Sequence, residues 1–325
     1  MTSLRKVSST AQKTIIISNN NRHDHQESPK RAKSIINADD IILYFPNVKA
    51  KDHRVNLHVS DMKQNGHIPA NDDTRSSYNL GDYLGLVVVN WMLERKGFSL
   101  NDYVEQKKHL LTVGSGAVKS YQNMTIWGSG VERQLPQRFR RWFQKSWFRK
   151  LDIRAVRGPL TRNYLMKLGH KCPEVYGDPA ILMPLIYNET ESGKRYEISI
   201  IPQLVTEKRI REKYPEAHVI SMNTNDYKSV IDQIVQSKLI ISSSLHGVIL
   251  ADAYGVPSVW YRGLGKSIDF KYLDYYASTG RKPEIIPTTI EDAMECKPMP
   301  LPNLEPLQKG LLETFPYDLW KKDKI

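Results

Sequence analysis

The 325-residue sequence predicts two parallel α/β domains that face each other across a cleft. Short apolar runs that suit strands alternate with longer amphipathic stretches, and this order is typical of parallel sheets covered by helices. Several of the apolar runs end in Gly/Ser turns that lead into a helix, which predicts ligand sites at the carboxyl ends of strands. The chain is long for one hydrophobic core, and its length suits two.

The N-terminal domain is expected over residues 39–187. Residues 1–38, which precede it, are rich in Ser, Asn, Lys and His, and this composition predicts a weakly ordered basic tail. Strands of the domain are predicted at 41–45, 109–113, 124–127 and 152–156. Helices are predicted after the segment 79–85, at 137–150 and at 160–168.

The C-terminal domain is expected over residues 196–300. The segment before it, 188–195, reads NETESGKR and is polar throughout, which predicts a linker. Strands are predicted at 197–201, 218–221, 239–241 and 258–261, and helices at 227–238 and after 245. Residues 301–325 have a partly helical pattern interrupted by prolines, and we expect them to pack back on the first domain.

The composition favours a cytoplasmic protein with anionic partners. A formal net charge of +12 and a pI near 9.4 suit nucleic acid, an acidic membrane surface, or small molecules that carry phosphate or carboxylate. The two cysteines, Cys172 and Cys296, form no disulfide framework and lie in no Cys/His cluster, so no metal site or other cofactor is expected. The longest apolar run, 84–93, is too short to span a bilayer.

The segment 238–257, KLIISSSLHGVILADAYGVP, carries the strongest functional signal. An apolar strand runs into three serines and His246, and an apolar helix follows. The first N–H groups of a helix are unpaired and its dipole favours anions, so this turn suits a phosphate or carboxylate ligand. The alternative is a core histidine whose ring is satisfied by backbone groups.

Five groups of residues, in this order along the chain, resemble the motifs of the polysaccharide pyruvyl transferase family. They are NLGD at 79–82, WGSG at 127–130, VRGPLT at 156–161, YGDPA at 176–180, and SSSLHG at 242–247 with AYGVP at 253–257. The resemblance implies two Rossmann-like domains facing across a cleft, as in glycosyltransferases of the GT-B type. It also implies transfer of the pyruvyl group of phosphoenolpyruvate onto a sugar as a cyclic ketal.

The resemblance makes His246 the catalytic histidine. Ketal formation needs a proton for the methylene carbon of the enol and a base for the attacking sugar hydroxyl. A histidine, with an ordinary pKa near neutrality, can supply the proton and then act as the base.

The phosphate and carboxylate of the donor need cationic partners. The resemblance assigns Arg157 to the donor, at the edge of the cleft, and the alternative is an ordinary surface arginine. Further donor contacts are expected at the histidine turn, from Ser243, Ser244 and Leu245. Some family members have an arginine where this chain has Ser244, so the missing charge is expected from Arg262 or Lys266.

The sugar acceptor is expected on the N-terminal domain. The candidate residues are Asn79, Gly81, Asp82, Gly128 and Ser129. Structural alternatives remain for some of them, since Asp82 could cap a helix beginning near Tyr83 and the Gly128 segment could be a plain tight turn. Asp178, which precedes Pro179, is predicted to be a turn residue.

The segment 137–150 combines basic residues with aromatic residues at helical spacing. One interpretation is a basic amphipathic helix on an anionic membrane, which a lipid-linked oligosaccharide acceptor would favour and which would place the protein at the inner face of the cell membrane. The other is an ordinary helix whose aromatic stripe packs in the core.

The sequence leaves two alternatives to pyruvyl transfer. A nucleotide-sugar glycosyltransferase or epimerase would need a carboxylate for the ribose, and Asp269 and Asp274 are the candidates, although neither lies in a glycine-rich motif. A nucleic-acid-binding protein would fit the charge of +12, but the sequence contains no nucleic-acid-binding motif, so no such partner is expected.

Overall fold

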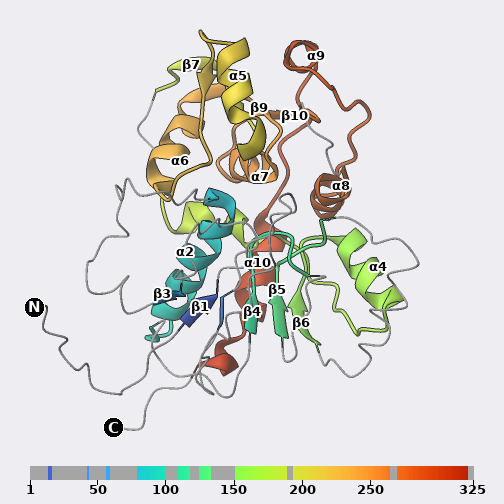
Figure 1. The fold of residues 1–325 in the computed structure, drawn as a ribbon. Helices are drawn as coiled ribbons and strands as arrows, with labels where there is room; N and C mark the ends of the chain where they lie inside the picture. Colours follow the sequence, from blue (N-terminus) through green and yellow to red (C-terminus); the bar gives the residue numbers. More distant parts are fainter. Residues whose placement is uncertain are drawn as a thin grey trace, which may run out of the picture.

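The computed structural model describes residues 14–16, 42–43, 56–58, 79–99, 109–117, 124–132, 151–188, 193–263 and 269–320, the first three ranges as strand backbone only. These residues form a mixed α/β fold with two parallel four-stranded sheets, in agreement with the α/β part of the prediction. Figure 1 shows one sheet in each half of the molecule. The predicted helix at 137–150 and Lys266 lie outside the described residues.

The first sheet is built from the N-terminal half, in the order β2-β4-β5-β6. Its strands are β2 (Ile42–Leu43), β4 (His109–Leu111), β5 (Met124–Trp127) and β6 (Leu151–Ala155). Strand β5 is buried along its whole length, as expected of a central strand in a parallel sheet with both faces covered. The helices of this half are α2 (Leu80–Glu94), α4 (Pro159–Lys167) and the 3₁₀ helix η1 (Pro179–Leu185).

A two-stranded antiparallel sheet accompanies the first sheet. It pairs β1 (Thr14–Ile16) with β3 (Asn56–His58). The short apolar run around Ile15 and Ile16 is the sequence signal for β1.

The second sheet has the order β10-β9-β7-β8. Its strands are β7 (Tyr196–Ile201), β8 (His218–Val219), β9 (Ser237–Ser242) and β10 (Ser258–Trp260). Its helices are η2 (Leu204–Thr206), α5 (Glu207–Lys213), α6 (Tyr227–Val235), α7 (Leu245–Ala253), α8 (Asp269–Ser278) and α9 (Ile290–Glu295). Helix α7 is apolar and buried for most of its length, so it packs on several sides at once.

Helix α2 joins the two halves. It begins at Leu80, whose N–H donates to the carbonyl oxygen of Met222 in the second half at 2.9 Å. Asn79 caps the helix, and its side-chain oxygen accepts a hydrogen bond from the Gly81 N–H at 3.2 Å. The alternative in which Asp82 caps a helix beginning near Tyr83 is therefore wrong, because the helix starts earlier and Asp82 lies in its first turn.

The C-terminal helix α10 (Glu305–Thr314) and the 3₁₀ turn η3 (Tyr317–Leu319) lie against the N-terminal half. The indole N–H of Trp127, at the end of β5, donates to the carbonyl oxygen of Leu311 at 3.1 Å. The Gln308 side chain donates to the Ile181 carbonyl oxygen at 2.8 Å. The last part of the chain thus covers the first sheet rather than the second.

Across the described ranges, no helix combines the length and the apolar character that a bilayer crossing requires.

Candidate active site

The turn between β9 and α7 presents His246 in the first turn of a helix. Strand β9 ends at Ser242, whose side-chain oxygen accepts a hydrogen bond from the Ser244 N–H at 3.0 Å and so fixes the turn. Ser244 is the N-cap of α7 in an extended conformation, yet its side chain makes no capping hydrogen bond. The first helical N–H groups therefore lack a side-chain partner at the position where the sequence predicts an anion site.

Three motifs that are far apart in the sequence meet at the His246 ring. The Nε2 atom of His246 lies 3.8 Å from Oδ2 of Asp178, at the start of η1. On the other side, the backbone of Gly81 in α2 is so close that a Cβ there would lie 1.8 Å from Nδ1 of His246. We call these three residues the His246 cluster.

The His246 cluster contains unsatisfied polar atoms. His246 is 9% exposed, and neither its Nε2 nor Oδ2 of Asp178 has a hydrogen-bond partner within the described structure. A separation of 3.8 Å is too long for a hydrogen bond, so both atoms keep their bonding capacity. Buried polar atoms are nearly always paired, and the exceptions need an explanation such as a catalytic role or an absent ligand.

Asp178 is the member of the cluster that sequence reasoning missed. Its Oδ1 accepts the Ala180 N–H at 3.1 Å and caps η1, which is the turn role that the sequence predicts. Its Oδ2 is free for a second task, because a carboxylate has two oxygens and the cap uses one. The sequence shows the GDPA motif, but only the packing of η1 against α7 reveals that Asp178 lies beside His246.

Arg157 lies in a second polar cluster, in which its terminal nitrogens are hydrogen-bonded and its Nε is left without a hydrogen bond among the described residues. Its guanidinium donates to Oγ of Ser115 at 2.8 Å and to the Val131 carbonyl oxygen at 2.7 Å, and its Nε lies 3.3 Å from Oδ2 of Asp274. Asp274 also accepts hydrogen bonds from the N–H and the hydroxyl of Thr161, at 2.9 and 2.6 Å. We call these residues the Arg157 cluster.

The two charged side chains of the Arg157 cluster have no contact with solvent. The Arg157 and Asp274 side chains are each 0% exposed, so Arg157 is neither at the edge of a cleft nor on the surface, as the two sequence interpretations place it. The physical reason is Asp274 of α8, whose carboxylate neutralises the charge and permits its burial.

With this geometry established, comparison with known proteins identifies the family. Residues 17–263 match the polysaccharide pyruvyl transferase family. The chain belongs to that family.

Two curated relatives accompany the family match. Uncharacterized protein L143 of Acanthamoeba polyphaga mimivirus is 29% identical over 213 residues, which cover 62% of this chain and 71% of L143. The succinoglycan biosynthesis protein ExoV of Rhizobium meliloti (strain 1021) is 32% identical over 216 residues, 62% of each chain. The chain thus spans less than two thirds of the length of ExoV.

In this pyruvyl transferase family member, the glycine-rich loops of the first sheet serve as supports. Gly128 has a φ of +84°, and a Cβ there would lie 2.3 Å from Cδ of Pro179, so the loop after β5 packs directly on the Asp178 turn. Ser129 is buried, donates to the Gly114 carbonyl oxygen at 3.0 Å and accepts the Gly116 N–H at 3.2 Å. These contacts join the two loops behind the His246 cluster.

The residues of the second half that are predicted to bind the donor differ in burial and in hydrogen bonding. Ser243 is buried, its hydroxyl accepts the Gln203 N–H at 3.1 Å, and its carbonyl oxygen accepts the Tyr272 hydroxyl at 2.6 Å. Leu245 is buried, whereas Ser244 is half-buried. Arg262 follows β10, remains partly exposed and binds Asp269 at 2.8 Å.

The two carboxylates considered for a nucleotide ribose are both engaged. Asp274 is enclosed in the Arg157 cluster, and Asp269 pairs with Arg262. On the acceptor side, Asn79 Nδ2 donates to Oδ2 of Asp82 at 2.9 Å, so the capping residue also orients this buried carboxylate.

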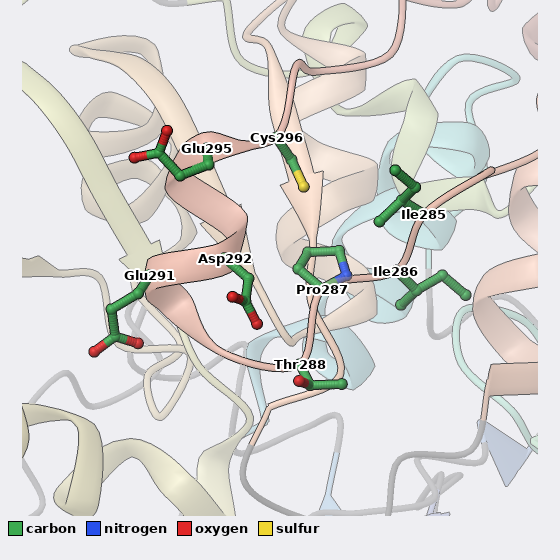
Figure 2. A pocket seen from close by; sticks show the side chains of 8 residues that line it. All are labelled: Ile285, Ile286, Pro287, Thr288, Glu291, Asp292, Glu295 and Cys296. Atoms are coloured by element: carbon green, nitrogen blue, oxygen red, sulfur yellow. The ribbon is translucent and has the colours of Figure 1, made fainter.

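A surface pocket of about 550 Å³ includes no residue of the His246 or Arg157 cluster in its lining, although its Pro287 carbonyl oxygen accepts the Arg262 N–H at 2.9 Å. It is lined by residues 285–288 and by Glu291, Asp292, Glu295 and Cys296, and Figure 2 shows the carboxylates of α9 around it. Its lining contains three carboxylates and no basic residue, which makes it a poor match for an anionic donor. Among the residues that the structure describes, no group of three or more His, Cys, Asp or Glu side chains could hold a metal ion.

Proposed function

We propose that this chain transfers the pyruvyl group of phosphoenolpyruvate onto a sugar of a cell-surface polysaccharide, or of its lipid-linked precursor, as a cyclic ketal. The observation that carries the proposal is the meeting of Gly81, Asp178 and His246, from three separate family motifs, around one imidazole. Family membership and the similarity to ExoV, a succinoglycan biosynthesis protein, support the same reaction class.

His246 is the proposed general acid and base. It protonates the methylene carbon of phosphoenolpyruvate, which leaves an oxocarbenium-like carbon bearing the phosphate oxygen. A sugar hydroxyl attacks that carbon and passes its proton back to the histidine. The C–O bond to phosphate then breaks with its electron pair, and a second hydroxyl closes the ring while its proton leaves with the phosphate.

Asp178 is the proposed positioning residue for His246. Its free oxygen lies close to Nε2, and a carboxylate beside an imidazole stabilises the protonated ring that must donate the proton. The Gly81 backbone on the other side limits rotation of the ring, so the proton is delivered from a fixed direction.

The remaining site residues are proposed in the roles that the family motifs suggest. The two halves act as Rossmann-like domains of the GT-B type, with Arg157 and the turn at Ser243, Ser244 and Leu245 on the donor side. Asn79, Asp82 and the Gly128 loop serve the acceptor side. In its buried position Arg157 acts on the site through its contacts with Ser115 and Asp274. A lipid-linked acceptor would place the reaction at the inner face of the cell membrane.

Phosphate release tests the proposal. Incubation with phosphoenolpyruvate and a galactoside or an N-acetylhexosamine should release inorganic phosphate and yield a pyruvylated sugar, detected by mass spectrometry. His246→Ala should lower turnover by about 10²- to 10⁴-fold, the usual contribution of general acid–base catalysis. The matched control is His170→Ala, since His170 is a half-buried histidine outside the site. Release of a nucleoside diphosphate from a nucleotide sugar, with no phosphate from phosphoenolpyruvate, would overturn the proposal.

A further inference from the structure

Lys271, in the first turn of α8, is a cation that no structural role explains. Its side chain is half-buried, and within the described structure its only polar contact is with the Tyr272 ring, whose centroid lies 5.3 Å from the ammonium nitrogen. A positive charge in the N-terminal turn of a helix opposes the helix dipole, so Lys271 does not stabilise α8.

Helix α8 holds Lys271 in a fixed place beside the site. The Tyr272 hydroxyl donates to the carbonyl oxygen of Ser243 in the histidine turn, at 2.6 Å. One helical turn after Lys271, on the same side of α8, Asp274 binds Arg157. The Tyr275 hydroxyl, also one turn after Lys271, donates to Asp252 of α7 at 2.8 Å. These anchors leave α8 little freedom to move relative to α7 and the Arg157 loop.

The charged groups that act on Lys271 come from three motif segments. Burial lowers the pKa of Lys271, and the nearby positive charge of Arg157 lowers it further, while Glu132 and Asp82 raise it. Asp82 belongs to α2, Glu132 follows the Gly128 loop, and Arg157 follows β6. The ammonium group therefore feels the charge of α2, which also contributes Gly81 to the His246 cluster, and the charge of the Arg157 cluster.

Lys271 also differs from the other described cations of the region. Arg157 lies 3.3 Å from Asp274, and Arg262 lies 2.8 Å from Asp269. Within the described ranges, Lys271 has no carboxylate within 4 Å, although it has lost part of its hydration. A partly desolvated ammonium group that no carboxylate contacts directly is a favourable site for an anion.

We propose that Lys271 binds the phosphate or carboxylate of phosphoenolpyruvate and supplies the charge that Ser244 lacks. This inference rests on the proposed function, because it names a donor-binding residue of the same site. An anion beside the ammonium group would restore the electrostatic stabilisation that burial removes, and so favour the charged lysine.

Calorimetric titration with phosphoenolpyruvate tests the assignment. Lys271→Met should weaken binding by about tenfold or more, as expected for loss of one charge-assisted contact, and Lys271→Arg should restore most of it. Lys282→Met is the matched control, because it removes the same charge from an exposed position of the same half. The fold of each variant is checked by its thermal unfolding midpoint.

The affinity of the wild-type protein should also fall as the pH rises through the lowered pKa of Lys271, because the ammonium group then loses its proton. The fall should be absent in Lys271→Arg, since arginine keeps its charge.

The outcomes separate the two proposals. A wild-type protein that binds no phosphoenolpyruvate overturns the proposed function as well as the role of Lys271. A wild-type protein that binds it, with Lys271→Met folded and equal in affinity, overturns the role of Lys271 alone. Weakened binding of uridine diphosphate with unchanged binding of phosphoenolpyruvate would also overturn the donor assignment.

Discussion

The Arg157 and His246 clusters are both buried pairs of a basic and an acidic side chain, but they differ in how they are satisfied. In the Arg157 cluster, Asp274 is bonded to Thr161 and contacts the guanidinium at 3.3 Å. In the His246 cluster, the two partners are 3.8 Å apart and each keeps an unpaired atom. Within the described structure the Nε atom of Arg157 also lacks a hydrogen bond, so one unpaired buried atom does not by itself mark an active site. The His246 cluster differs because polar atoms of both partners are unpaired at the place where three family motifs meet.

The largest effect is expected from breaking the Arg157 cluster. Asp274→Ala should lower the free energy of unfolding by about 3–5 kcal/mol, because it leaves the Arg157 charge buried and uncompensated. Chemical denaturation measures the change. Asp269→Ala is the matched control, since it breaks a partly exposed pair with Arg262 and should cost about 0–1 kcal/mol. Equal losses in the two variants would contradict the distinction between the pairs.

Gly81→Ala should disturb the geometry of the His246 cluster and lower activity, with less effect on the free energy of unfolding. A methyl group at position 81 would lie 1.8 Å from Nδ1 of His246, so the ring must move. Misplacing a catalytic group by about 1 Å can cost about 10²-fold in rate, and a loss of that size is expected in phosphate release from phosphoenolpyruvate. Gly193→Ala should be silent, because a Cβ at Gly193 would meet nothing within 4 Å. Full activity of Gly81→Ala would show that the ring position is not critical.

Asp178→Asn removes the negative charge of the His246 cluster but keeps a side chain that can cap η1. Asparagine is as good an N-cap as aspartate, so the Ala180 contact and the free energy of unfolding should change by less than about 0.5 kcal/mol. Turnover should fall by about tenfold, because the amide no longer stabilises a protonated His246. Steady-state kinetics and a denaturation curve on the same sample check both expectations. A variant that loses stability but keeps its turnover would assign Asp178 to structure alone.

The smallest effect is expected at the cap that supports Gly81. Asn79→Ala removes the side chain that accepts the Gly81 N–H and should lower the free energy of unfolding by about 1 kcal/mol. Asn79→Ser retains a cap and should recover most of that loss, which differential scanning calorimetry can resolve. If serine fails to recover stability, the bond from Asn79 to Asp82 is the more important contact.

The sequence predicts the local parts of this molecule well. Apolar runs and Gly/Ser turns locate the strands of both sheets, and strand boundaries such as that of β6 shift by one residue. The strand–turn–helix around His246 forms as predicted, because an apolar run, a serine turn and an apolar helix depend on neighbouring residues.

Contacts between distant segments were beyond sequence reasoning. The Asp178–His246 and Arg157–Asp274 pairs each join segments whose proximity depends on how α2, η1, α7 and α8 pack. Arginine is usually exposed, so its type gives no signal of the burial that Asp274 makes possible. Lys271 likewise lies outside every recognised motif, and only its place in the fold makes it a candidate.

The contacts of α10 impose an order on biosynthesis. Trp127 is hydrogen-bonded to Leu311, and Ile181 to Gln308. The ribosome adds Leu311 and Gln308 long after the strands of the first sheet. Synthesis runs at about 5–20 residues per second, so several seconds or more pass before α10 can pack against the nascent first half. A nascent chain stalled before residue 305 would expose apolar surface of this sheet to chaperones and proteases. Quality control in the cell would therefore act on the first half mainly before α10 emerges.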